Sequence, residues 1–278
     1  MRADLHTHTV YSDGAHTPEE LAAIAKKNGV ELLAVTDHDN MEGADRKQRA
    51  IEGAGLLFTH GIEISAYLGC KVHVTGYACD PHCEAYRAYL QSRIDGSFLR
   101  AQDIIDKCRK IGISLSMEEV LAERQMQSAP IHTMHVARAI HKKGICADAG
   151  EVYETLLCRG APAYSDIGRP TPFDAISFIH AFGGIACLAH PGRIELDEGE
   201  LKNLVDRMKE CGLDGIECVY PSHTERETNY FFKLAKERSL FVTGGSDTHI
   251  EGAGRSVGSP VFEPSEELLE RICPMGGK

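Results

Sequence analysis

The sequence predicts an α/β fold in which a sheet of seven strands is interrupted, after its fourth strand, by a segment that is entirely helical. In residues 1–80 and again in residues 165–278, short apolar segments typical of buried strands alternate with amphipathic helices. Residues 81–164 have helical periodicity and no strand-like segment. Strands that are joined by helices form parallel sheets, and this number of strands favours closure into a barrel.

In the first block, strands are expected at residues 2–8, 30–39, 56–65 and 71–77. The first helix, over residues 17–29, has the strongest local signals. Thr17 is suited to the N-cap, Pro18 to the first helical position and Glu20 to a capping box, and Gly29 ends the pattern. A more polar helical segment follows at residues 40–55.

The helical segment is expected to contain helices over residues 83–112, 116–125 and 131–144. In the second block, helices at 172–184, 201–212 and 224–239 alternate with strands at 185–192, 213–220 and 240–249. We therefore expect one domain built from residues 1–80 and 165–278. Residues 81–164 are expected to form a helical cap over its mouth.

Composition restricts the partners and the compartment. The 278 residues carry a net charge of −11, which disfavours extended nucleic-acid binding and anchoring at an acidic membrane surface. The start of the chain lacks the apolar run of a signal peptide, and no segment is apolar enough to span a membrane. We expect a cytoplasmic protein with ten reduced cysteines, and read Cys79, His82 and Cys83 in "CDPHC" as free side chains rather than a zinc half-site. The oligomeric state is not predicted.

Residues that commonly bind metals stand in or directly after nearly every predicted strand. His6 and His8 are two residues apart and would project from the same side of the first strand. Glu63 lies within an otherwise apolar strand, where a carboxylate needs a cation or an ion partner. The carboxyl ends of parallel strands meet at one face of a barrel, so these residues are expected to converge there. The other residues of this metal-binding type are Asp13, Asp37, His38, Asp39, His73, His190, Asp247 and His249.

The segments "DLHTHTVYSDG", "AVTDHD", "GIEIS", "VHVTGY", "LAHPGR" and "GGSDTH" together resemble the PHP (polymerase and histidinol phosphatase) family of metal-dependent phosphoesterases. The helical segment resembles the family branch that includes nucleoside 3′,5′-bisphosphate phosphatases, related exonucleases and enzymes that hydrolyse cyclic sugar phosphates. The resemblance implies a distorted (β/α)7 barrel with a trinuclear metal centre.

The resemblance also implies how two to three divalent ions would be bound. The first ion would be held by His6, His8, Glu63 and Asp247, and Glu63 would bridge to a second ion held by His73 and His190. The third would take Asp13, His38 and His249, although some family members have His in place of Asp13. Every ligand is a nitrogen or oxygen donor, which suits Mn²⁺, Fe²⁺ or Zn²⁺.

Further residues are predicted to act around the ions. Arg193 is expected to clamp a phosphate, and His223 to donate a proton to the leaving group or bind phosphate. Asp37 is expected to orient a ligand. Arg169, His135 and Arg138 are candidate substrate contacts. The remaining histidines are expected to be structural or exposed: His16, His60, His82, His132, His141 and His180.

The predicted activity is hydrolysis of a phosphate ester of a small metabolite, by a hydroxide that bridges two of the ions. The substrate is either a cyclic sugar or nucleotide phosphate or a nucleoside 3′,5′-bisphosphate. A histidinol-phosphatase-like monoesterase and a 5′–3′ exonuclease acting on short RNA are alternatives. More remote ones are a non-catalytic PHP scaffold and an amidohydrolase-like barrel, which would usually need a bridging carboxylated lysine.

Overall fold

A computed structural model describes residues 1–124, 130–252 and 254–273. The chain forms two compact units. The first contains residues 1–87 and 170–278, and the second contains residues 88–169. Helix α3 (Glu84–Lys110) begins in the first unit and continues into the second.

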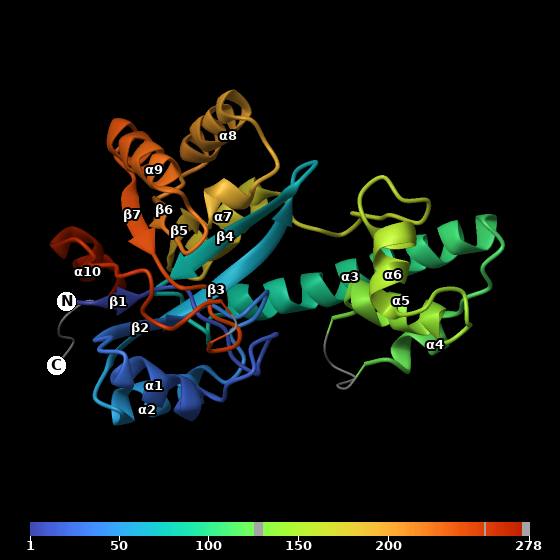
Figure 1. Ribbon diagram of the computed structural model, residues 1–278, viewed down its shortest axis with the longest axis horizontal. Coiled ribbons are helices and arrows are strands. Elements are labelled where there is room, and N and C mark those ends of the chain that lie inside the picture. Colours follow the sequence, from blue (N-terminus) through green and yellow to red (C-terminus); the bar gives the residue numbers. More distant parts are fainter. Residues whose placement is uncertain (125–129, 253, 274–278) are drawn as a thin grey trace. The chain divides into compact units, whose positions relative to one another are not determined.

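The first unit contains one seven-stranded sheet, and its strands are hydrogen-bonded in the order of the sequence. Their bounds are β1 (Ala3–Asp4), β2 (Leu32–Val35), β3 (Leu57–Tyr67), β4 (Lys71–Tyr77), β5 (Ile185–Leu188), β6 (Gly215–Val219) and β7 (Phe241–Gly244). The sheet is nearly closed into a barrel surrounded by helices (Figure 1), which confirms the predicted fold class.

The sheet is mixed, whereas the alternation of strands and helices had predicted parallel strands. β4 runs antiparallel to both β3 and β5, and all the other neighbours are parallel. Only residues 68–70 connect β3 to β4, which is far too short for the crossover that parallel strands require. A hairpin is therefore the only connection that this length allows.

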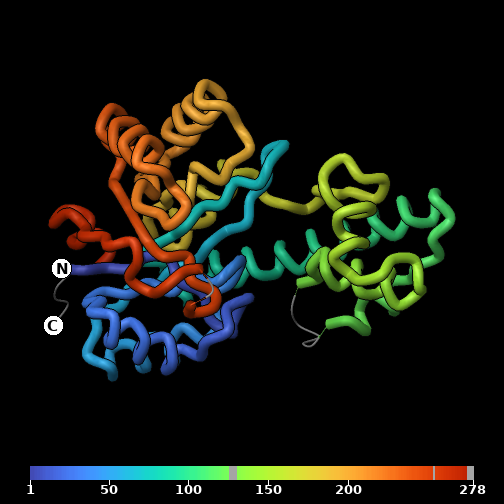
Figure 2. Tube along the Cα trace, viewed as in Figure 1, coloured from blue at the N-terminus to red at the C-terminus, as the bar shows by residue number. Residues whose placement is uncertain are grey.

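Backbone bonds between the two ends of the sheet bring the start of the chain against the segment that follows β7 (Figure 2). Leu5 N donates to Gly244 O at 3.1 Å, and Asp247 N donates to His6 O at 2.7 Å. The regular part of β1 ends at Asp4, so His6 and His8 lie beyond it rather than inside the predicted strand. Their placement next to Asp247 depends on this long-range pairing.

The helices of the first unit lie outside the sheet. Figure 1 shows α1 (Pro18–Lys27) beside α2 (Ala44–Gly53), and α8 (Glu198–Glu210) beside α9 (Glu225–Glu237). The capping box predicted for α1 is confirmed, since the Thr17 side chain accepts from Glu20 N and the Glu20 side chain accepts from Thr17 N. The unit also contains α7 (Pro172–Ala181), the short 3₁₀ turn η2 (Pro191–Arg193) and α10 (Glu266–Ile272). The sequence patterns did not predict α10, which buries Leu268 and Ile272 in the core of the sheet.

In its described residues, 88–124 and 130–169, the second unit contains helices, turns and loops and no strand. It contains most of α3 together with α4 (Met117–Leu121), α5 (Thr133–His141), α6 (Ala149–Val152) and the π-helical turn η1 (Tyr153–Leu157). Residue 125, the last of the helix predicted over 116–125, lies outside the described residues. Ile104, Cys108, Val136, Ile140 and Val152 are buried together, so the unit has an apolar core of its own.

None of the helices in the described part of the chain has both the length and the apolar character needed to cross a membrane. All ten cysteines are free. The "CDPHC" side chains belong to no metal-binding group found among the described residues, and His82 Nε2 instead lies 3.0 Å from Asp45 Oδ1.

Candidate metal centre

Glu63 of β3 is completely buried, and its carboxylate lies at the centre of a group of histidines. Five imidazoles surround its two oxygens. Oε2 lies 3.2 Å from His6 Nε2, 3.3 Å from His8 Nε2 and 3.2 Å from His38 Nδ1. Oε1 lies 2.8 Å from His73 Nδ1 and 2.9 Å from His190 Nε2. An oxygen surrounded in this way is suited to bridging two cations.

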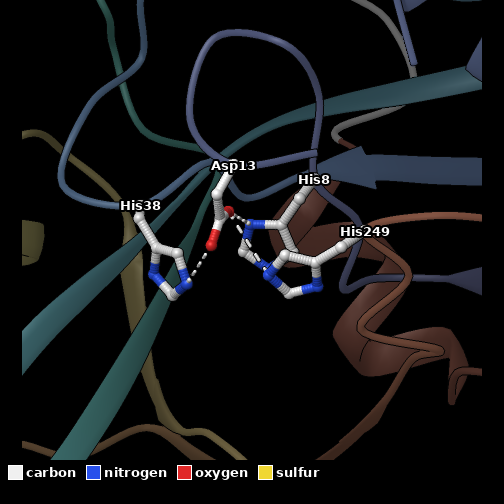
Figure 3. Close-up of side chains that lie close together, drawn as sticks. All are labelled: His8, Asp13, His38 and His249. Atoms are coloured by element: carbon white, nitrogen blue, oxygen red, sulfur yellow. Dashed lines mark ion pairs between the residues drawn. The ribbon is translucent and has the colours of Figure 1, made fainter. Parts of the chain in front are cut away.

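Three overlapping groups could each hold a metal ion. They are His6, His8, Glu63 and Asp247; His38, Glu63 and His73; and His8, Asp13, His38 and His249. Figure 3 shows the last group, in which the imidazoles of His38 and His249 reach the Asp13 carboxylate at 3.8 and 3.3 Å. These groups contain eight of the nine side chains that sequence reasoning selected as metal ligands, and the ninth, His190, contacts Glu63. His8, His38 and Glu63 each belong to two of the groups.

Several ligand-type atoms in this cluster are buried and have no hydrogen-bond partner within the described residues. They are His6 Nε2, His8 Nδ1, His8 Nε2, Glu63 Oε2 and His190 Nδ1. A buried polar atom without a partner is costly, and one cation between His6 Nε2, His8 Nε2 and Glu63 Oε2 would satisfy three of these atoms. The residues present therefore fit a group of divalent ions.

The electrostatics of the cluster support the same interpretation. Burial alone would lower the pKa of His8, but the carboxylates of Asp247 and Glu63, 3.1 and 3.3 Å from its Nε2, raise that pKa to about 9. Burial would raise the pKa of Asp247, yet the charge of His6 and the contact with His8 hold it well below its usual range. The protons that these imidazoles attract without metal occupy the positions that a divalent ion would take.

Local backbone conformation aims two of the candidate ligands. His190 lies two residues after the end of β5 and has φ 27°, and Asp247 lies three residues after the end of β7 and has φ 49°. Residues other than glycine rarely adopt positive φ, and such strain often marks functional sites. At Asp247 the strain is offset by backbone bonds, because its N–H donates to His6 O and its carbonyl accepts from His249 Nδ1 at 3.0 Å.

Asp13 lies at the exposed side of the cluster, and its side chain is 55% exposed. It belongs to a loop that Asp37 holds. Asp37 accepts hydrogen bonds from Thr9 N, Thr9 Oγ1 and Ser12 Oγ, each at 2.7 Å. The buried Lys47 ammonium lies 2.6 Å from Asp37 Oδ2. These contacts support a positioning role for Asp37, and its predicted part in orienting a metal ligand stays a prediction.

Sequence reasoning missed four residues around the cluster: Lys47, Glu217, Tyr220 and Arg255. Glu217 of β6 lies with Oε1 3.1 Å from His6 Nδ1, and its Oε2 accepts from His190 N at 2.6 Å. Glu217 lies within an apolar strand, the same feature by which Glu63 was selected, so the sequence could have identified Glu217 as well.

Lys47, Tyr220 and Arg255 have no comparable feature in the sequence. Lys47 is the buried lysine of this region, and it pairs with Asp37 rather than with the metal groups, so it does not match the bridging lysine of the amidohydrolase-like alternative.

The two residues predicted to act at the leaving group and the phosphate differ in their surroundings. His223 Nδ1 lies 3.1 Å from Cys218 O, which can only accept, and Nε2 accepts from Gly192 N at 3.2 Å. Burial lowers the pKa of His223, in keeping with this neutral form. Proton donation by His223 would require one of these bonds to break. Arg193 is 51% exposed at the edge of the cluster, and its Nη1 donates to Tyr220 Oη at 3.0 Å.

The remaining selected residues are the candidate substrate contacts and the histidines expected to be structural. Arg169, His135 and Arg138 belong to the helical unit, and their contacts with substrate stay predictions. Among the histidines expected to be structural, His16 Nε2 accepts from Glu251 N at 3.0 Å and His180 Nε2 lies 2.8 Å from Asp214 Oδ2.

Comparison with known proteins places this architecture in a family. The family model for the PHP domain matches residues 4–159. A 3′,5′-nucleoside bisphosphate phosphatase from Chromobacterium violaceum is 32% identical over 274 residues, which cover 96% of each chain. A phosphoribosyl 1,2-cyclic phosphate 1,2-diphosphodiesterase from Eggerthella lenta is 32% identical and covers 90% of this chain and 94% of its own. A 5′–3′ exoribonuclease from Haemophilus influenzae is 32% identical and covers 99% and 98%.

Two solved structures have the same fold as this chain. A structure from Chromobacterium violaceum, described as an amidohydrolase with bound sulfate and no metal, superposes with a TM-score of 0.75 at 30% identity, covering 96% of this chain and 93% of that one. A proposed metal-dependent phosphoesterase from Bifidobacterium adolescentis gives 0.75 at 26% identity, with coverage of 99% and 96%.

The nearly closed barrel and its buried cluster of imidazoles and carboxylates define a metal-dependent phosphoesterase. The chain belongs to the PHP-domain family.

Proposed function

We propose that the cluster around Glu63 holds two to three divalent ions and hydrolyses phosphate esters of a small phosphorylated metabolite. The observation that supports this most strongly is the buried Glu63 carboxylate, which lies within 3.3 Å of five imidazoles. Imidazole and carboxylate donors without thiolate suit Mn²⁺, Fe²⁺ or Zn²⁺.

Each ion has a proposed set of ligands. His6, His8, Glu63 and Asp247 would hold the first, in agreement with one of the three groups. Glu63, His73 and His190 would hold the second, and the approach of His38 to Glu63 makes His38 a candidate for this ion as well. Asp13, His38 and His249 would hold the third, with His8 Nδ1 3.7 Å from Asp13 Oδ1. The exposure of Asp13 suggests that the third ion is bound most weakly.

Divalent ions at such a site supply charge that polarises a phosphoryl group and makes hydroxide available near neutral pH. The residues of the chain would position the reactants. The exposed guanidinium of Arg193 can bind two non-reacting phosphate oxygens in a bidentate fork. Glu217 holds His6 and the backbone of His190, and so keeps both imidazoles directed at Glu63.

Two substrate classes are proposed from the relatives, a nucleoside 3′,5′-bisphosphate and a cyclic sugar phosphate. A second candidate function, removal of nucleotides from the 5′ end of short RNA, is favoured by the exoribonuclease from Haemophilus influenzae, which matches nearly the whole chain. The net charge of −11 disfavours a long polyanion, because phosphate backbones bind through basic surfaces.

A turnover screen of the Mn²⁺-loaded protein tests the proposal. The panel contains nucleoside 3′,5′-bisphosphates, 5′-phosphorylated short RNA, cyclic sugar and nucleotide phosphates, and histidinol phosphate, with release of inorganic phosphate as the readout. Time-resolved ³¹P NMR with a cyclic phosphate then shows whether the monoester accumulates or is hydrolysed in turn. A protein that binds its ions and is inert towards every ester would overturn the proposal.

It stays a prediction that residues 81–164 form a cap over the site. The cytoplasmic location of the protein also stays a prediction. A histidinol-phosphatase-like activity would appear in the same screen as selective hydrolysis of histidinol phosphate.

A further inference from the structure

The two oxygens of the Asp247 carboxylate have different surroundings. Oδ1 faces the cluster and lies 3.1 Å from His8 Nε2 and 3.5 Å from His6 Nε2. Oδ2 faces away, where it accepts a hydrogen bond from Tyr220 Oη at 2.7 Å and pairs with Arg255 Nη1. Because only Oδ1 faces the histidines, the two oxygens of this carboxylate are not equivalent as ligands for an ion in the cluster.

Arg255 is fixed from several directions. Its Nη1 donates to the backbone oxygen of Asp247 at 2.6 Å, and its Nη2 donates to Tyr220 Oη at 2.7 Å. The guanidinium carbon also lies 5.2 Å from the centre of the Tyr220 ring. The side chain is 24% exposed, whereas that of Asp247 is 3% exposed. The guanidinium of Arg255 therefore binds both the carboxylate and the backbone carbonyl of Asp247. These two contacts stabilise the left-handed backbone conformation of Asp247.

The direction of the Tyr220 hydrogen bond follows from its partners. Arg193 Nη1 and Arg255 Nη2 can only donate, so the phenol oxygen accepts from both. The single phenol proton is then left for Asp247 Oδ2, which can only accept. Tyr220 and Arg255 thus use the lone pairs of Oδ2 that a metal ion would otherwise share.

We propose that Arg255, acting with Tyr220, makes Asp247 a monodentate metal ligand that binds through Oδ1 alone. This inference rests on the proposed function, since it requires an ion between Asp247 and the histidines. Arg255 is a positioning residue, because it acts on the ion through Asp247 and does not touch it.

The two arginines next to Tyr220 then have separate roles. Arg193 reaches Asp247 Oδ2 only at 3.5 Å and is half exposed, so it can leave for a phosphate at little cost. Arg255 is held by the carboxylate, the carbonyl and the phenol oxygen, so it stays in place when substrate binds. Arg193→Ala is therefore a matched control for Arg255→Ala, because both guanidinium groups contact the phenol oxygen of Tyr220.

The test measures Mn²⁺ binding to the metal-depleted full chain by calorimetry and by electron paramagnetic resonance of free Mn²⁺. Arg255→Ala is expected to weaken the binding of one ion by roughly 10–100-fold, the usual effect of removing a group that orients a ligand. Tyr220→Phe should weaken the same ion, and Arg193→Ala should leave Mn²⁺ binding unchanged. Arg255→Lys, which keeps the charge and loses the fork, is the second variant if Arg255→Ala does not fold.

Several outcomes would overturn the inference. Folded Arg255→Ala or Arg255→Lys protein that binds Mn²⁺ as tightly as the wild type would do so, as would a crystal structure of the Mn²⁺-loaded wild type with both Asp247 oxygens on the ion. An equal loss of Mn²⁺ affinity in Arg193→Ala would also refute the separation of roles. If the wild type itself binds no Mn²⁺, Fe²⁺ or Zn²⁺, the proposed function fails, and that result is distinct from the others.

Discussion

Replacement of Lys47 by methionine removes the only cation paired with the buried Asp37 in the described structure. The side chain of Lys47 is 3% exposed and that of Asp37 is fully buried, so water cannot replace the lost ammonium. Breaking a buried ion pair from one side typically costs 3–5 kcal/mol. Asp37 keeps three hydrogen bonds from Thr9 and Ser12. We therefore expect the lower end, about 3 kcal/mol.

A second variant separates the lost charge from the lost packing. In Asp37→Asn/Lys47→Met no charge is left buried without a partner, so the double variant should be more stable than Lys47→Met alone. The expected coupling between the two positions is about 2 kcal/mol, within the range for residues in direct contact. Arg49→Met, an exposed position on the same helix, is the control and should change stability by less than about 0.5 kcal/mol.

The assay is urea unfolding of the metal-depleted protein, because bound ions would add their own stabilisation. Hydrogen exchange measured on peptides from α2 and β2 reports the barrel unit separately from the helical unit. Lys47→Met and the double variant, but not Arg49→Met, should also bind the third ion more weakly, since Asp37 holds the loop that carries Asp13. A loss below 1 kcal/mol in Lys47→Met, matching that of Arg49→Met, would show that this ion pair does not stabilise the barrel.

Three further predictions concern the metal centre. Glu63→Ala should abolish turnover and reduce the number of bound ions measured by elemental analysis, because it removes a shared ligand; wild-type ion content would contradict this. Arg193→Ala should lower kcat/KM by roughly 10–100-fold while the ions stay bound, and an unchanged kcat/KM would exclude Arg193 as a phosphate clamp. Adding Mn²⁺ at a hundred times its dissociation constant should stabilise the protein by about 2.7 kcal/mol, visible as a rise in Tm that excess chelator reverses. A Tm indifferent to Mn²⁺ and chelator would argue against a specific site.

The side chains around Glu63 could be selected from the sequence because each stands in or after an apolar segment, where a charged or imidazole group is conspicuous. The capping box of α1 could be predicted because Thr17 and Glu20 are three residues apart and satisfy each other locally. Glu217 carries the same kind of signal and was overlooked.

The remaining features depend on contacts between residues far apart in the chain. The direction of β4 is set by a connection of three residues, and the approach of His6 to Asp247 by bonds between the two ends of the sheet. Arg255 lies in a glycine-containing loop, and nothing in its neighbourhood distinguishes it from an exposed arginine. Lys47 looks equally like a surface residue of a polar helix.

The sequence by itself therefore determined which donors are available and that they lie near strand ends, because period and residue type are local properties. Only the tertiary structure decided that these donors share one buried carboxylate, and which charges outside the cluster hold them. An imidazole or carboxylate acquires its role from the groups packed against it, and closure of the barrel brings those groups together from both ends of the chain.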